Sequence, residues 1–312
     1  MRADALPLIT VFVPWIGREP FIGDAIRSLL LQDYPNLEIL VSDNSLSPAA
    51  RSLIADLHDP RMRIIERSQR RLAPAAHFDA CLQDARGEYV MILSDDDLVE
   101  PRYVSSMYEA IRSRPDVKVC IGEQIAIGER DNLTPAASPE VHFRTYDGPG
   151  FLTRRLLNLH GLPIFTYMSL FARRADMLQH LYRDYPDGSH ADNYMMMALA
   201  ITGRVAVSSA KFYYRIYEKS AGLSTPFPSL LAACTQYERD ARLLLRRSRR
   251  RIGTLRSFIL RALLHIRTSG VMYRRLFQMY RKRLRPTEFF VSLAQLLLYT
   301  CGIFRAWPLP RR

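Results

Sequence analysis

The stretch that decides the fold is EYVMILSDDD, residues 88–97, in which an apolar run ends in three consecutive acids. Residues 88–93 predict a buried β-strand of the continuously apolar kind that parallel sheets use. Acids at the carboxyl end of such a strand lie where open α/β sheets bind their ligands. Three adjacent carboxylates repel one another, so we expect a positive group nearby, most simply a divalent cation with a phosphorylated ligand. A second interpretation stays open, in which the acids cap a helix that begins at Pro101.

Strands and helices alternate over the first 120 residues. Strands are predicted at Leu8–Pro14, Glu38–Ser42, Arg63–Glu66 and 88–93, and helices at Glu19–Leu31, Pro48–Leu57 and Pro74–Ala85. This βαβαβαβ order is typical of an α/β fold with a mostly parallel, doubly wound sheet flanked by helices. The sequence has neither a GxGxxG nor a GxxxxGKS motif, which argues against a Rossmann dinucleotide enzyme and a P-loop NTPase.

The pattern is looser after Pro115. It predicts strands at Val117–Ile127, Phe165–Phe171, Val205–Val207 and Phe212–Ile216, helices at Phe151–Leu159 and Tyr194–Ile201, and a loop at Thr134–Gly150. A second acidic stretch, residues 187–193, contains Asp192 and precedes the Tyr194–Ile201 helix. From Pro228 onward only helices are predicted. We therefore expect two domains, an α/β domain over residues 1–227 and a helical tail over residues 228–312.

Composition is that of a globular protein, with 48% hydrophobic and 24% charged residues. Four widely spaced cysteines match no zinc or CxxC pattern and indicate a reducing compartment. Residues 1–4 lead almost directly into a strand, so no signal peptide is expected. These features predict a cytoplasmic protein.

The net charge of +13 comes from one segment. Fifteen of the 44 Lys and Arg residues lie between Ala241 and Thr287, where there is no Asp or Glu, and the rest of the chain has 29 basic against 31 acidic residues. An acidic partner would therefore bind residues 241–312. The uncharged run Phe289–Phe304 is too short to span a bilayer. It fits an interfacial helix on anionic lipid, anchored by Trp307 and arginines, and the alternative is a helix packed back on the catalytic domain. The tail has no recognised nucleic-acid motif, so we expect no nucleic acid as a partner.

Residues 8–45 resemble the opening of the inverting family 2 glycosyltransferases, which have the GT-A fold. The match continues through 85–89 and 93–97, and ends with Ala191-Asp192, Gly203-Arg204-Val205 and Tyr213-Tyr214-Arg215-Ile216. These motifs are weak singly, but their order and spacing over about 210 residues make the resemblance specific.

The resemblance implies a role for each matching acid. Asp96 would ligate Mg²⁺ or Mn²⁺ between the donor phosphates, Asp95 would hold ribose or sugar hydroxyls, and Asp97 would support the metal. Such a cation neutralises the charge that grows on a nucleoside-diphosphate leaving group. Asp192 matches the base that takes the acceptor proton, and as an alternative it caps the following helix.

Three residues match the nucleotide site of the family. Asp43 would accept hydrogen bonds from the base or ribose, or it closes an Asx turn after its strand. Pro14 and Trp15 would lie beside the base, where Trp15 could stack on it or simply pack in the core.

The chain departs from the family pattern at several positions. Ile16-Gly17 follow Pro14-Trp15 where relatives have a Tyr-Asn pair, and Asp79, Ala191 and Tyr217 replace a usual Asn, Glu and His. The metal acids and the base are kept.

We therefore expect an inverting transferase that moves a sugar from a nucleotide-diphosphate donor to a hydroxyl of a glycan or lipid-linked saccharide, at the inner face of the cell membrane. Two alternatives stay open, namely a polyprenyl-phosphate acceptor, which needs no base, and a non-catalytic binding module.

Overall fold

The computed structural model describes residues 6–17, 21–46, 52–54, 56–67, 71–131, 133–158, 169–186, 190–217, 226–282 and 286–300. The chain forms two compact units. The first contains Met1–Asp184 and Ala191–Glu218, and the second contains Tyr185–His190 and Lys219–Arg312. This division lies near the boundary expected at residue 228, but the helical unit also takes the short segment Tyr185–His190.

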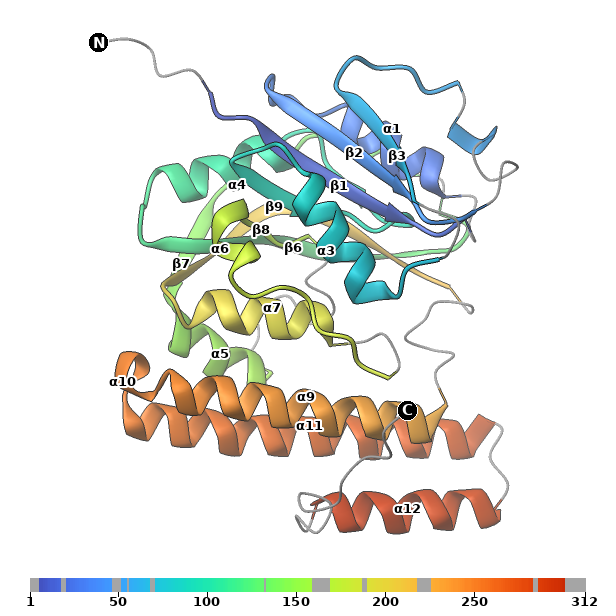
Figure 1. Ribbon diagram of the computed structural model, residues 1–312, viewed down its shortest axis with the longest axis vertical. Helices are drawn as coiled ribbons and strands as arrows, with labels where there is room; N and C mark the ends of the chain where they lie inside the picture. Colours follow the sequence, from blue (N-terminus) through green and yellow to red (C-terminus); the bar gives the residue numbers. More distant parts are fainter. Residues whose placement is uncertain are drawn as a thin grey trace. The chain divides into compact units, whose positions relative to one another are not determined.

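The described part of the first unit is built around a nine-stranded sheet (Figure 1). Its strands are β1 (Ile9–Trp15), β2 (Leu37–Asp43), β3 (Met62–Glu66), β4 (Tyr89–Ile92), β5 (Leu98–Val99), β6 (Val117–Gly128), β7 (Phe143–Asp147), β8 (Phe171–Arg173) and β9 (Arg204–Ile216). They follow the order β3-β2-β1-β4-β8-β6-β9-β5, and β7 also pairs with β9. The first four strands are parallel as predicted, whereas β5, β7 and β8 pair antiparallel with their neighbours, so the whole sheet is mixed.

Helices cover both faces of this sheet. They are α1 (Ile22–Leu30), the 3-10 turn η1 (Ser52–Ile54), α3 (Pro74–Asp84), α4 (Tyr103–Arg112), α5 (Gly148–Leu156), α6 (Arg174–Leu178) and α7 (Ala191–Ala200). The apolar sides of α1 and α4 share one core cluster with Val11, Val41 and Met91 of the central strands. Helix α3 lies on the opposite face (Figure 1). There the His77 ring contacts the Ser42 hydroxyl at 2.8 Å.

Several predicted elements differ from the structure. The strands expected at Val205–Val207 and Phe212–Ile216 are one long strand, β9. The expected loop Thr134–Gly150 contains β7, a half-exposed strand without apolar alternation. Only η1 is seen where a helix was expected at Pro48–Leu57, and residues 47–51 and 55 lie outside the described part. Residues 159–168, which include most of the strand expected at Phe165–Phe171, also lie outside it.

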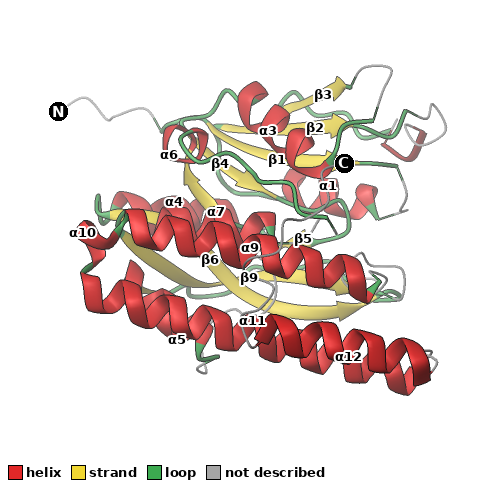
Figure 2. Cartoon of the chain, turned by 60° about the horizontal axis from the view of Figure 1, so that its bottom comes forward, coloured by secondary structure: helices red, strands yellow, loops and turns green. Residues whose placement is uncertain are grey.

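The second unit is helical, as expected. It contains α9 (Phe227–Arg247), α10 (Arg249–Ile252), α11 (Thr254–Lys282) and α12 (Pro286–Thr300), drawn in red in Figure 2. Helices α9 and α11 run side by side (Figures 1 and 2). Their buried faces form a core with α12, built from Phe227, Cys234, Met272, Leu276 and Leu296 among others.

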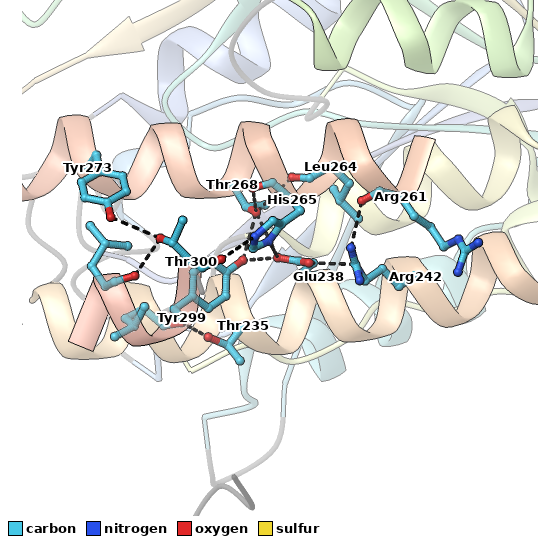
Figure 3. A network of polar contacts seen from close by, with 12 residues as sticks. Thr235, Glu238, Arg242, Arg261, Leu264, His265, Thr268, Tyr273, Tyr299 and Thr300 are labelled. Atoms are coloured by element: carbon cyan, nitrogen blue, oxygen red, sulfur yellow. Dashed lines mark hydrogen bonds and ion pairs between the residues drawn. The ribbon is translucent and has the colours of Figure 1, made fainter. Parts of the chain in front are cut away.

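A buried carboxylate, Glu238, joins the three long helices (Figure 3). Arg242 lies 2.8 Å from it, His265 contacts it at 3.0 Å, and Tyr299 donates a hydrogen bond to it. Burial alone would raise the pKa of Glu238, but the hydrogen bonds from Tyr299 and His265 outweigh burial and lower it. This ionised group therefore fixes α12 against α9 and α11.

Candidate active site

Asp43 and Trp15 end two neighbouring parallel strands. Trp15 of β1 is paired in register with Asp43 of β2, which brings both residues to the carboxyl edge of the sheet. Asp43 is buried, and its Oδ1 accepts the backbone N–H of Ser45 at 2.8 Å. This Asx turn is the structural role that the sequence left open for Asp43, and it holds the carboxylate at the ligand-binding edge.

Trp15 is completely buried in the main core cluster with Val13 and Ile22. A ring that stacks on a base needs one accessible face, so this conformation favours the packing role that the sequence left open for Trp15. Pro14, paired with Ser42, is also buried.

The three consecutive acids lie in three different environments. Asp97 is fully buried, Asp95 is 6% exposed, and Asp96 is half-buried. Within the described residues, no three His, Cys, Asp or Glu side chains converge into a ready-made metal cage. Proteins usually hold Mg²⁺ through one or two carboxylates together with substrate phosphates, and a site of that kind needs no such cluster.

Asp97 is tied to the far strand β9. Its Oδ1 accepts the backbone N–H of Arg215 at 2.9 Å, and burial, followed by the charge of Asp96, raises the pKa of Asp97 well above its usual value. This contact uses Oδ1, whereas Asp97 Oδ2 is buried without a hydrogen-bond partner in the described part of the chain. The structure therefore gives Asp97 an anchoring position behind the acidic loop.

Asp96 is held from two sides by the end of β9. The Tyr217 hydroxyl donates to Asp96 Oδ2 at 3.1 Å, and Arg215 Nε donates to the Asp96 carbonyl oxygen at 3.0 Å. Arg215 is 2% exposed, and its guanidinium lies 4.3 Å from the centre of the Phe21 ring. The backbone and the carboxylate of Asp96 are both oriented by these contacts.

Asp192 is the second residue of α7 and is half-buried. Its Oδ1 accepts the backbone N–H of Asn193 at 2.8 Å and the Asn193 side-chain amide at 3.0 Å. These contacts hold the carboxylate in the first turn of the helix, and because α7 begins at Ala191, Asp192 is not the N-cap that the sequence also allowed. Asp79, a departure from the family, instead accepts the backbone N–H of Tyr182 at 2.8 Å.

Tyr214 shows that the acids of the two sequence segments lie in one place. Burial raises the pKa of Tyr214 to about 12, and three carboxylates add to the shift. They belong to Asp97, Asp96 and Asp192. Since charges act strongly only within about 10 Å at moderate salt, the acidic loop after β4 and the start of α7 both lie near the Tyr214 phenol.

Sequence reasoning assigned no role to Arg215, Tyr214 or Tyr217, although all three are in or next to the Tyr213–Ile216 motif. The available signal was an arginine inside an apolar strand segment, because a buried guanidinium needs carbonyl or carboxylate partners. Tyr217 stands where relatives often have His, and here it contacts the acid expected to bind metal.

Comparison with known proteins supports the resemblance. The family model described as "Glycosyl transferase family 2" matches residues 10–178, more than half of the chain. The succinoglycan biosynthesis protein ExoO of Rhizobium meliloti is 29% identical over 233 residues, which cover 70% of this chain and 63% of that protein. A GalNAc(5)-diNAcBac-PP-undecaprenol β-1,3-glucosyltransferase of Campylobacter jejuni is 33% identical over 94 residues, 30% of each chain. The chain thus spans less than two thirds of these relatives.

Solved structures share the fold at low sequence identity. Residues 1–349 of S. aureus TarS superpose with a TM-score of 0.66 and 14% identity, over 94% of this chain and 81% of that one. The mannosyltransferase PcManGT of Pyrobaculum calidifontis, in complex with GDP-Man and Mn²⁺, gives 0.57 and 16%, over 97% and 88%. The first unit has the GT-A architecture, and the chain belongs to glycosyl transferase family 2.

Proposed function

We propose that this chain is an inverting glycosyltransferase that moves a sugar from a nucleotide-diphosphate sugar to a hydroxyl of a glycan or lipid-linked saccharide, in cell-surface polysaccharide synthesis. The observation that supports this most strongly is the shared surroundings of Asp96, Asp97 and Asp192 at Tyr214. Single displacement with inversion needs a donor-side group that stabilises the leaving diphosphate and an acceptor-side base. Two acidic segments at one place supply both.

On the donor side, Asp43 and Asp95 would accept hydrogen bonds from the nucleoside and sugar hydroxyls. Asp96 would ligate the cation, with Tyr217 fixing one of its oxygens, and Asp97 would hold the loop through Arg215. When bound, the divalent cation would neutralise charge on the departing nucleoside diphosphate.

On the acceptor side, Asp192 would take the proton of the attacking hydroxyl. Asn193 orients its Oδ1. A carboxylate that is held in place at the start of a helix is a suitable general base, because its position relative to the attacking hydroxyl is fixed. Tyr214 keeps its proton at neutral pH, since burial and the nearby carboxylates raise its pKa to about 12.

Two relatives support the acceptor class. The C. jejuni protein is named for transfer to an undecaprenol-diphosphate-linked saccharide, and ExoO is named for succinoglycan biosynthesis. A lipid-linked saccharide hydroxyl fits both names.

Asp192→Asn tests the reaction, with Asp116→Asn as the matched control because Asp116 is exposed and lies outside the site. We expect Asp192→Asn to lower kcat at least about a hundredfold, while Mn²⁺-dependent binding of the nucleoside diphosphate, measured by calorimetry, stays unchanged. Asp96→Asn should instead weaken that binding.

Two results would contradict the proposal. Full transfer activity in Asp192→Asn would indicate a polyprenyl-phosphate acceptor, whose oxygen is already ionised. Nucleotide binding by the unaltered chain without transfer or donor hydrolysis would indicate a binding module.

We also propose that the enzyme works at the cytoplasmic face of the cell membrane and contacts anionic lipid through residues 241–312. Across the described helices, none has the length and apolarity needed to cross a bilayer. One face of α12 packs on α9 and α11, and residues 241–287, with fifteen Lys or Arg and no Asp or Glu, carry the charge that anionic lipid attracts. Trp307, the expected anchor, lies outside the described residues.

A further inference from the structure

We propose that one surface of the helical unit docks on an anionic bilayer, namely the corner where α9 passes through α10 into α11, residues 246–258, together with the exposed apolar face of α11. This inference rests on the membrane part of the proposed function and identifies the side chains that would make the contact. It is carried by charge and exposure within the helical unit alone.

The corner is densely cationic. Six of its arginines are exposed, and five of them lie within residues 246–251, namely Arg246, Arg247, Arg249, Arg250 and Arg251. None of the five forms an ion pair with another residue in the described part of the chain. No acidic residue occurs between Ala241 and Thr287, so nothing in this segment neutralises them. A polybasic surface of this kind is attracted to anionic lipid with a strength that grows with each arginine.

Large apolar side chains are exposed directly beside these arginines. Leu255 is 71% exposed and Phe258 is 62% exposed, and Leu255 lies only four residues after Arg251. The apolar face continues along α11 through Ile266 at 66% and Phe277 at 50%. Residues 255 to 277 extend over about 33 Å of helix, so this face can lie flat in a bilayer interface.

The combination favours lipid over nucleic acid. The phosphate backbone of a nucleic acid would pair with the arginines, but it offers no apolar surface to the exposed leucine and isoleucine side chains. A lipid interface takes both, because head groups pair with arginine while acyl chains cover the apolar side chains.

The exposed face of α12 is the competing surface. Phe290 is 66% exposed and Val291 is 60% exposed, but α12 carries no Lys or Arg between residues 286 and 300. The absence of cations there leaves it without the charge complementarity that the corner has. If the corner is the docking surface, substitutions there should weaken binding to anionic vesicles. If the exposed face of α12 is the docking surface, substitutions in α12 should weaken it instead.

The experiment is co-sedimentation of the full chain with vesicles of pure phosphatidylcholine or of phosphatidylcholine with phosphatidylglycerol. We expect binding to the anionic vesicles and little to the neutral ones. Arg249→Gln with Arg250→Gln should lower the partition coefficient about thirtyfold, whereas Arg112→Gln with Arg144→Gln, on the first unit, should leave it unchanged.

The apolar contribution is tested by a second matched pair. Leu255→Ser with Phe258→Ser should weaken vesicle binding about tenfold or more, and Phe290→Ser with Val291→Ser should not. All of these side chains are exposed, so circular dichroism should show folded protein in each variant.

Three outcomes would overturn the inference. They are equal binding to neutral and anionic vesicles, loss of binding only in the α12 variant, and arginine-dependent binding to a DNA duplex without binding to vesicles. The assay contains neither donor nor acceptor, so its failure would leave the proposed transfer reaction standing.

Discussion

Arg215→Met should destabilise the first unit strongly, because this buried guanidinium holds backbone carbonyls from two loops. Its Nε donates to the Asp96 carbonyl at 3.0 Å, and its Nη1 contacts the Gly128 and Asp131 carbonyls at 3.2 Å each. Hydrogen bonds from a charged donor contribute about 1.5 kcal/mol or more each, which gives about 4–5 kcal/mol for three. Methionine fills much of the space that Arg215 occupies, and it removes the free-energy penalty of burying a charge. The expected net loss in the free energy of unfolding is therefore about 3 kcal/mol.

The free energy of unfolding can be measured by urea titration with tryptophan fluorescence. The chain has two tryptophans, so a Trp307→Phe background leaves buried Trp15 as a reporter of the first unit. Arg215→Lys is the matched control, since it keeps the charge but loses the fork, and it should show about half of the destabilisation. Both variants should also weaken Mn²⁺-dependent nucleotide binding, because the acidic loop loses its support. A loss below about 1 kcal/mol for Arg215→Met would refute this account of the loop.

Three further predictions concern other buried groups. Burial and the charge of Arg67 lower the pKa of His77 to about 4, so the unfolded chain binds a proton that the native state does not. About 3 kcal/mol of stability should therefore be lost as the pH falls from 6.5 to 4, and a flat stability profile there would contradict it. Glu238→Gln should destabilise the helical unit by about 3 kcal/mol, seen as an earlier loss of ellipticity at 222 nm, and an unchanged transition would show that the network is dispensable. Tyr217→Phe should raise the Mn²⁺ concentration for half-maximal nucleotide binding several-fold, and calorimetry that shows no change would remove Tyr217 from the positioning of Asp96.

The sequence predicted the parts of the fold that depend on local pattern. Apolar runs gave β1, β2 and β4, the alternation of strands and helices placed β3, and the acids at 95–97 were correctly expected at the carboxyl end of β4. Helical periodicity gave α1, where Ile22, Ile26 and Leu29 are buried. These features need no knowledge of distant partners, since each arises from the burial of one element.

Long-range contacts could not be predicted in the same way. Arg215 lies 119 residues from Asp96, so only the folded sheet shows that β9 supports the acidic loop. Strand β7 was missed because an edge strand has little need for apolar alternation, and β9 was split because Ser208 and Ser209 interrupt its apolar pattern. The role of Trp15 was ambiguous, because the residues next to it in the sequence do not show whether other parts of the fold cover its ring.

The unequal surroundings of the three acids have a chemical consequence for the order of binding. Asp97 Oδ1 accepts the Arg215 backbone N–H and Asp96 Oδ2 accepts the Tyr217 hydroxyl, so at most one further oxygen of each of these two carboxylates could face a cation before the donor arrives. A divalent ion bound by so few protein oxygens needs the diphosphate to complete its shell. Because coupling between two ligands is reciprocal, the donor should then bind more tightly with the cation by the same factor that the cation gains from the donor. The rigid support of Asp96 thus favours a site that assembles around the nucleotide sugar over one that stores metal in its absence.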